Sequence, residues 1–191
     1  MARPKSEDKR SAILFAAIEV FAERGLGAAT SAITAKAGVA EGTLFTYFKT
    51  KDELVNAVYR AIKLDLADAM MSGFPRRANV RDRLRHVWNQ YVDWGVANPS
   101  QQAVLKQIQV WRGLTEESKA AGSAPFAEIE IMAEDAVAER ILHDVPRPFI
   151  GAAIGALAEI TMDFIRQEPA QAELYRNSGF EMLWAGIIRR R

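Results

Sequence analysis

The sequence predicts an all-α fold of about nine helices, and three observations support this prediction. Apolar residues recur at spacings of three and four along most of the 191 residues, which is typical of helices that bury one face. No segment shows the strict apolar–polar alternation of a half-buried strand. The content of 49% apolar and 26% charged residues is that of a globular chain with a sizeable core. We therefore expect a small N-terminal trio of helices followed by a larger helical bundle.

Glycines bound the first two expected helices. An apolar stripe over residues 13–21 predicts a first helix that ends at Gly25, because glycine readily adopts the left-handed conformation found just after a helix. Thr30 or Ser31 is expected to N-cap a short second helix, which Gly38 ends.

The third and fourth helices and the clearest linker come next. A short third helix fits residues 41–47, and Thr50 is expected to cap a longer helix over residues 51–71. Residues 72–79 (SGFPRRAN) lack periodicity and carry a glycine and a proline, which indicates a linker. Its last residue, Asn79, can cap the fifth helix.

Prolines divide the rest of the chain. The fifth helix is expected to end at the Asn98–Pro99 step, and a sixth to run from Pro99 to about residue 111. A helical stretch that starts at residue 115 contains Gly122 and Pro125, so we expect a kink or a restart there. A firm helix over 129–142 and two final helices over about 149–167 and 170–188 follow, separated by Pro146, Pro148 and Pro169.

Residues 30–48 (TSAITAKAGVAEGTLFTYF) have the pattern of a helix-turn-helix. Ile33 and Leu44 are expected to face inward, Phe48 to close the end of the second helix, and Gly38 to supply the turn. Short polar side chains on the outward face would let this helix approach base edges, and lysines beyond it suit phosphate oxygens. A helical hairpin that does not bind DNA is the alternative that the pattern alone leaves open.

The run AGVAEGTLFTYFKTKDEL, residues 37–54, closely resembles the DNA-binding segment of TetR-family transcriptional regulators, and FAERG (21–25) and TSAI (30–33) fit the same family. The resemblance implies a DNA-binding domain over residues 1–50 and an effector-binding, dimerising domain over 51–191, with helix 51–71 connecting them. The chain departs from the family at Thr34, usually alanine, and at Phe45, usually tyrosine.

The resemblance also implies roles for individual residues. Thr43 and Tyr47 stand where the family contacts phosphate, and Lys51 where it contacts the backbone. Phe45 and Thr46 occupy recognition-helix positions. The complete expected DNA-binding set is Thr30, Ser31, Glu41, Gly42, Thr43, Phe45, Thr46, Tyr47, Lys49 and Lys51. A basic N-terminal arm of Arg3, Lys5, Lys9 and Arg10 could also reach DNA, and a solvated tail is the alternative.

Aromatic and polar residues in the larger half suggest an apolar cavity with a few polar anchors, which would bind a hydrophobic or aromatic effector. Plain core packing is the alternative for each of these residues. The expected effector-binding set is His86, Trp88, Tyr91, Trp94, Gln107, Trp111, Phe126 and Met132.

The last two helices resemble the dimerisation face of the family. Residues 149–158 are apolar on nearly all sides and rich in glycine and alanine, so this helix must be buried on more than one side. An intramolecular core is the alternative. The expected interface set is Ile150, Ile154, Leu157, Phe180, Leu183, Trp184 and Ile187.

Several classes of function are excluded or disfavoured. The absence of cysteine excludes disulfides and cysteine-ligated metals, and the two histidines, His86 and His143, have no metal-site spacing, so we expect no metal or cofactor. No nucleophile elbow or phosphate-binding loop is present, so we expect no enzyme. A polar start over residues 1–10 and an uninterrupted apolar run of about half a bilayer span predict a cytoplasmic protein without membrane contact. The net charge of +1 says nothing about DNA.

We therefore expect a ligand-responsive transcriptional repressor that binds a near-palindromic double-stranded DNA operator as a homodimer and is released by a small effector. A DNA-binding repressor without an effector is one alternative. A helical carrier or enzyme for a hydrophobic metabolite is another.

Overall fold

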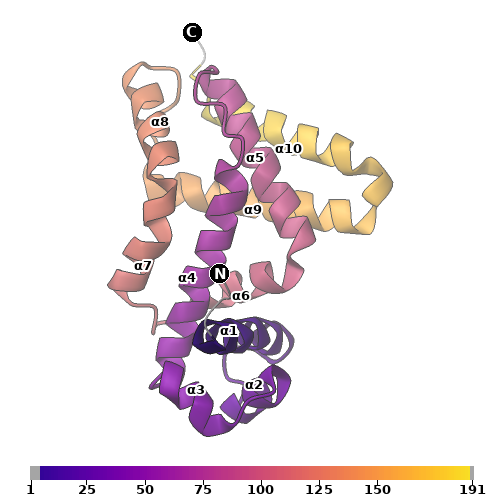
Figure 1. Cartoon of the computed structure of the whole chain (residues 1–191). Coiled ribbons are helices and arrows are strands. Elements are labelled where there is room, and N and C mark those ends of the chain that lie inside the picture. The colour runs from indigo at the N-terminus through magenta and orange to yellow at the C-terminus, as the bar shows by residue number, and fades with distance from the viewer. Residues whose placement is uncertain (1–4, 190–191) are drawn as a thin grey trace. The chain divides into compact units, whose positions relative to one another are not determined.

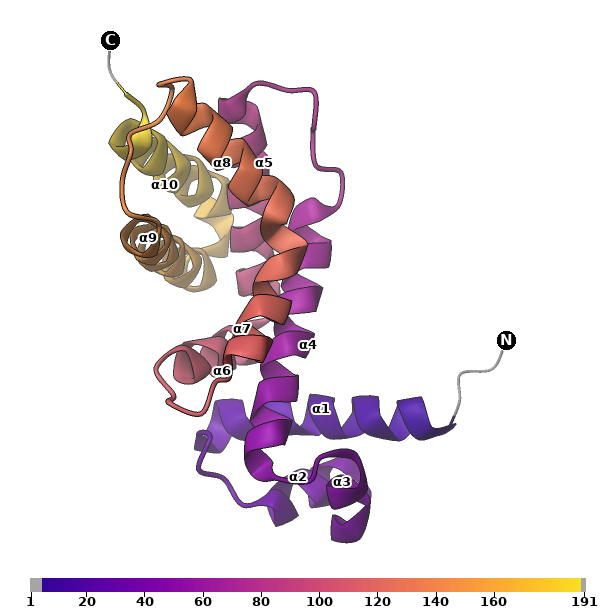
Figure 2. The ribbon, with the colours of Figure 1, turned by 90° about the vertical axis from the view of Figure 1, so that its left-hand side faces the viewer.

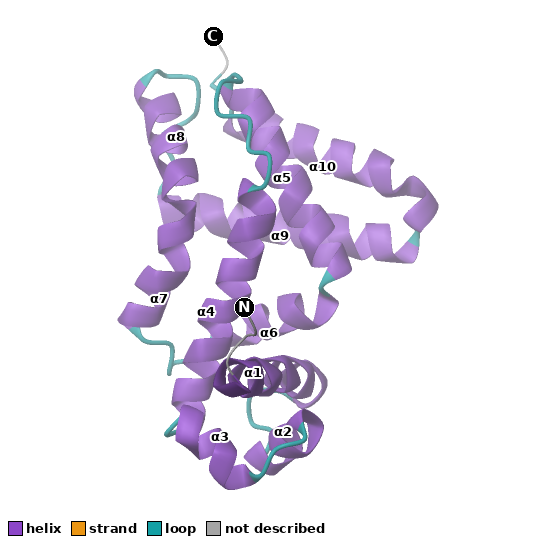
Figure 3. Cartoon of the chain, in the orientation of Figure 1, coloured by secondary structure: helices purple, strands orange, loops and turns teal. Residues whose placement is uncertain are grey.

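A computed structural model describes residues 5–189 and contains ten α-helices and no strand in that range (Figures 1 and 3). The all-α prediction is confirmed. The helices are α1 (Lys5–Arg24), α2 (Thr30–Ala37), α3 (Glu41–Tyr47), α4 (Lys51–Met71), α5 (Val80–Ala97), α6 (Pro99–Gln109), α7 (Glu116–Ser123), α8 (Ala127–Ala138), α9 (Arg147–Gln167) and α10 (Ala172–Ile187), with short 3₁₀ turns η1 (Ala124–Phe126) and η2 (Pro169–Gln171).

The chain forms two compact units, and α4 contributes to both. The first unit contains the residues up to Asp65 together with Asn98–Ala124, and the second contains Leu66–Ala97 together with the residues from Pro125 onward. The expected boundary at residue 50 therefore does not divide compact units, because α6 and α7 pack with the N-terminal helices.

Most of the expected helix ends are confirmed by local geometry. Gly25 and Gly38 have φ values of 81° and 65°, as left-handed C-cap residues require. The Thr50 hydroxyl accepts a hydrogen bond from the Glu53 amide, and the side-chain Oδ1 of Asn79 accepts one from the Asp82 amide. The predicted cap of α2 is wrong: Ala29 is the N-cap, no side chain caps the helix, and Thr30 is the first helical residue.

The segment around α8 differs from the sequence prediction. Pro125 lies in η1, so the helix restarts there as one of the two expected alternatives. The helix α8 ends at Ala138 instead of residue 142, because Arg140 adopts a left-handed φ of 59°. The chain then pairs with the end of α10 through an antiparallel bridge between Leu142 and Ile188. Pro148 does not precede α9 but lies in its first turn.

The core of the second unit is formed by α5, α9 and α10, which lie against one another (Figure 2). Trp88, Met162 and Phe180 are its large, almost fully buried side chains. The helices approach closely at Gly179, where an added Cβ would lie 2.6 Å from both Thr161 Oγ1 and Trp88 Cζ2. Glycine is thus required here by space.

Candidate nucleic-acid interface

The segments α2 and α3 form the helix-turn-helix that the sequence predicted. Gly38 ends α2 with its amide donating to the carbonyls of Ala35 and Thr34, and the Val39 amide also donates to Thr34. Ile33 and Leu44 are fully buried, as expected. Both short helices lie on the same side of α1 (Figures 1 and 2).

Phe48 joins this core with an exposed fraction of 2%, and the guanidinium of Arg10 lies 5.4 Å from the centre of its ring. One residue of the basic N-terminal arm is thereby engaged within the domain. Arg3 lies outside the described residues, and the Lys5 side chain is likewise not described.

Four of the expected DNA-binding residues form an exposed face of α3. Glu41, Gly42, Phe45 and Thr46 are exposed, and their spacing places them on one side of α3. Six further members of the expected set flank this face. Ser31 and Lys49 are exposed, and Thr30, Thr43, Tyr47 and Lys51 are half-buried.

Hydrogen bonds fix several of these side chains. The Thr30 hydroxyl donates to Glu41 Oε1 at 3.0 Å and so joins α2 to α3. The Thr46 hydroxyl donates to the Gly42 carbonyl within the same helix at 2.9 Å. Unlike Lys36, whose ammonium pairs with Glu23 at 3.3 Å, Lys49 and Lys51 form no ion pair with the residues that the structure describes. Their charges therefore remain available for phosphate groups.

A glutamine on α6 ties that helix to the DNA-binding segment. Gln107 Oε1 accepts a hydrogen bond from the Leu26 amide, and its Nε2 donates to the Phe21 carbonyl, each at 3.1 Å. Both backbone groups border the loop that starts at Gly25. Gln107 belongs to the expected effector-binding set, and the structure gives it this anchoring role, which spacing in the sequence could not reveal.

A second polar cluster joins α4 to the start of α7 in the first unit. Asn56, which is 5% exposed, donates to the carbonyls of Asp52 and Gly113 and accepts from the amide and hydroxyl of Thr115. Arg60 donates to the hydroxyl of the fully buried Ser118. Sequence reasoning missed this cluster, although an asparagine within the apolar run 54–59 was a signal of a buried polar contact.

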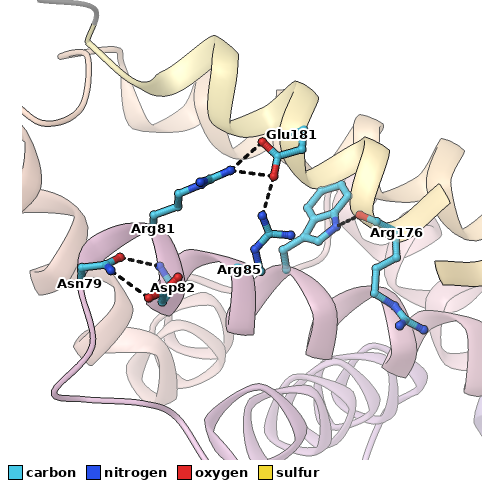
Figure 4. Close-up of polar contacts among 7 residues, drawn as sticks. Asn79, Arg81, Asp82, Arg85, Arg176 and Glu181 are labelled. Carbon is cyan, nitrogen blue, oxygen red and sulfur yellow. Dashed lines mark hydrogen bonds and ion pairs between the residues drawn. The ribbon is translucent and has the colours of Figure 1, made fainter. Parts of the chain in front are cut away.

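The other expected effector-binding residues are divided between the two units. Gln107 and Trp111 lie in the first unit, and the other six, His86, Trp88, Tyr91, Trp94, Phe126 and Met132, lie in the second. The Trp88 indole donates to the Arg176 carbonyl at 2.9 Å, and His86 Nε2 lies 3.1 Å from the Met70 carbonyl (Figure 4 shows the surroundings of Arg176). Burial, with a smaller contribution from Glu159, raises the pKa of Tyr91.

The expected dimer interface needs correction. Phe180, Leu183 and Ile187 are at most 9% exposed and pack in the core of the second unit, which is the intramolecular alternative. Ile150, Ile154, Leu157 and Trp184 are partly buried against the same core. Other apolar side chains of α9 and α10 are exposed instead: Phe149, Ile160, Phe164, Leu174 and Met182, by 44–67%.

The exposure of α9 is unusual for its composition. Residues Pro148–Gln167 have a mean hydropathy of 1.5 over their most apolar window and are only 22% buried there, so this helix is apolar and long enough to cross a membrane. One such helix is weak evidence for a membrane, because a helix that is covered by another protein subunit has the same composition. Among residues 5–189, no three His, Asp or Glu side chains are grouped as metal ligands would be.

Comparison with known proteins shows what the helix-turn-helix segment resembles. Residues 13–58, which include all of α2 and α3, match the family model of bacterial regulatory proteins, tetR family. The helix-turn-helix segment of this chain is thus similar to that of TetR-family regulators.

Two curated relatives are bacterial regulators. The fatty acid metabolism regulator protein of Bacillus subtilis (strain 168) is 27% identical over 99 residues, or 51% of this chain and 50% of that protein. The HTH-type transcriptional regulator YvdT of the same organism is 46% identical over 55 residues, or 28% of each chain. The match thus spans half or less of the length of these relatives.

Solved TetR-family structures share the fold over nearly the whole chain. A regulator from Marinobacter aquaeolei VT8 has a TM-score of 0.87 at 21% identity, covering 99% of this chain and 100% of that one. LfrR from Mycobacterium smegmatis with proflavine has a TM-score of 0.67 at 20% identity, covering 96% and 99%. FadR from Bacillus subtilis with stearoyl-CoA has a TM-score of 0.69 at 20% identity, covering 93% and 99%. At these identities the likeness establishes the fold alone.

Proposed function

We propose that this chain is a TetR-family regulator: a cytoplasmic homodimer that represses transcription at a near-palindromic operator and is released by a small apolar effector. The accessible face of α3 carries the proposal. Glu41, Gly42, Phe45 and Thr46 on one side of that helix are exposed, while its opposite side holds the fully buried Leu44. A helix presented in this way can enter the major groove, and the half-buried hydroxyls of Thr43 and Tyr47 and the Lys51 ammonium can meet phosphates beside it.

Two copies of the chain are needed to read a palindrome, and the exposed apolar face of α9 and α10 supports a dimer. We call this face the α9/α10 stripe: Phe149, Ile160, Phe164, Leu174 and Met182. The stripe replaces the buried residues in the interface that the sequence predicted. Water-exposed phenylalanine, isoleucine and leucine side chains along two neighbouring helices are typical of an isologous interface.

The stripe can be tested with two matched substitutions. Ile160 on α9 and Ile131 on α8 are 56% and 57% exposed, so glutamate at either position should leave the fold of a single chain intact. Sedimentation velocity should show a dimer for the wild type and for Ile131→Glu, and a monomer for Ile160→Glu. A dimer that survives Ile160→Glu would contradict the proposed interface.

The nature of the effector is proposed from the relatives and from the composition of the second unit. LfrR is bound to proflavine, a flat aromatic cation, and FadR to stearoyl-CoA, which has a long acyl chain. Both molecules have large apolar parts. The second unit of this chain is rich in aromatic side chains, including Trp88, Tyr91 and Trp94. Binding of the effector would then lower the affinity for DNA, and binding of DNA would lower the affinity for the effector by the same factor.

An effector-independent repressor is the second candidate, and one observation favours it. The Trp88 indole N–H, a natural anchor for a ligand, already donates to the Arg176 carbonyl, and the ring is 2% exposed. Thermal unfolding with and without long-chain acyl-CoA and with and without proflavine separates the two candidates. A rise in melting temperature with either compound, together with loss of DNA binding, supports the effector-responsive function.

DNA binding itself is tested by selection of random duplexes with the full chain. We expect enrichment of one near-palindromic sequence, and loss of its binding when Thr43→Ala, Tyr47→Phe and Lys51→Ala are combined. Lys119→Ala is the matched control, because Lys119 pairs with Glu116 on α7. Lys51→Ala alone should weaken binding to all sequences and reduce the salt slope by about one. Retained affinity in the triple variant would contradict the assignment.

A further inference from the structure

The exposed face of α3 has an unusual chemical character. Its four residues are Glu41, Gly42, Phe45 and Thr46. Glycine contributes no side chain, and phenylalanine offers only apolar contact. Hydrogen bonding from this face to base edges therefore depends on one carboxylate and one hydroxyl.

Neither of these groups has a hydrogen to donate to DNA. The Thr46 hydroxyl hydrogen is directed to the Gly42 carbonyl at 2.9 Å, which leaves only oxygen lone pairs facing outward. The ionised Glu41 carboxylate accepts hydrogen bonds and donates none. The face that enters the groove thus contains acceptors and an aromatic ring, without a single side-chain donor.

The Glu41 carboxylate is held by the neighbouring helix. The Thr30 hydroxyl of α2 donates to Glu41 Oε1 at 3.0 Å, and the exposed side chain keeps its second oxygen for another partner. This contact restricts a flexible side chain to one orientation before DNA binds. It also orients the Thr30 hydroxyl toward Glu41, although the sequence assigned that residue to the DNA backbone.

We propose that Glu41 is the specificity-determining residue of α3 and selects cytosine in each half of the operator, with Thr30 as its positioning residue. The proposal rests on the proposed operator binding through α3. In the major groove cytosine presents the N4 amino donor, which a carboxylate can accept, whereas guanine presents only the O6 and N7 acceptors, which repel it. Adenine presents its N6 donor beside the N7 acceptor, so it is the weaker partner for a carboxylate.

The remaining residues of the face refine the expected sequence. The exposed Phe45 ring is suited to a thymine methyl group, the one apolar feature of the major groove. The Thr46 oxygen can accept from a second amino group. We therefore expect half-sites in which α3 meets cytosine and thymine and avoids guanine on the strand it reads.

Substitution of Glu41 by glutamine converts an acceptor into a group that both accepts and donates. Glutamine pairs with the adjacent N6 and N7 atoms of adenine. Selection from random duplexes with Glu41→Gln should move the preference at one position of each half-site from cytosine to adenine. The wild type should discriminate against the adenine duplex by about 5- to 150-fold, the range of one mismatched base pair.

The positioning role of Thr30 has its own readout. Thr30→Val removes the hydroxyl and should flatten the preference at the same base pair, while Thr30→Ser restores the hydroxyl and should restore the preference. Lys51→Ala is the contrast, because loss of a phosphate contact should lower affinity on every duplex and leave the ranking of bases unchanged. Melting temperatures of all variants identify any that fail to fold.

The outcomes separate this inference from the proposed function. A wild-type chain that selects a palindrome without cytosine at any α3-contacted position, or a Glu41→Gln variant with unchanged base preference, overturns the role of Glu41 and leaves operator binding intact. A wild-type chain that selects no sequence overturns the proposed operator binding and, with it, the role of Glu41.

Discussion

Substitution of Gln107 by alanine tests whether α6 anchors the DNA-binding segment. The side chain makes two hydrogen bonds of 3.1 Å, one from the Leu26 amide and one to the Phe21 carbonyl. Each is part-buried, and a hydrogen bond of this kind contributes about 0.5–1.5 kcal/mol to the free energy of unfolding. Gln107→Ala removes both hydrogen bonds and leaves the Leu26 amide and the Phe21 carbonyl without these partners, which should lower the free energy of unfolding by about 2 kcal/mol.

For a chain of this length, a loss of about 2 kcal/mol lowers the melting temperature by roughly 4–8 °C. Circular dichroism at one fixed protein concentration measures the shift, since association also affects the melting temperature. Gln109→Ala is the matched control, because Gln109 is exposed on the same helix. A Gln107→Ala melting temperature equal to that of the control would refute the anchoring role.

Two further predictions concern the second unit. In a denaturant titration, Gly179→Ala should lower the free energy of unfolding by about 1–3 kcal/mol, because Thr161 and Trp88 both crowd the new methyl group. Gly95→Ala should lower it less, because the new methyl group would meet only the flexible side chain of Met162. The hydrogen bond from Arg85, aided by Arg81, lowers the pKa of Glu181 from its ordinary value of 4.5 (Figure 4). The ionised Glu181 therefore stabilises the folded chain above pH 4.5, and this stabilisation is lost as the pH falls through the lowered pKa. Glu181→Gln should therefore lower the melting temperature at neutral pH, and a difference that persists unchanged in acid would contradict this assignment.

The fold and the helix-turn-helix could be predicted because their determinants are local. Apolar periodicity, the positive-φ residues Gly25 and Gly38 and the caps Thr50 and Asn79 act within a few residues of the chain. The cap of α2 was not predicted, because Thr30 and Ser31 are both good capping residues, whereas the backbone places the apolar Ala29 at the N-cap.

Contacts between distant segments could not be predicted from one sequence. Gln107 meets Phe21 and Leu26 across more than eighty residues, so its spacing carried no signal. The interface prediction failed for Phe180, because periodicity finds an apolar face and does not say whether the same chain or another copy covers it. The hydrogen bond between Thr30 and Glu41 likewise required the crossing of α2 and α3 to be known.

The central claim is that two copies of this chain read one operator through α3. Footprinting on the selected duplex, combined with the mass of the complex from sedimentation equilibrium, tests it most directly. The account predicts two protomers per duplex and two protected major-groove segments about 34–36 Å apart, or an integral number of helical turns. One protomer bound to a single protected segment would contradict it.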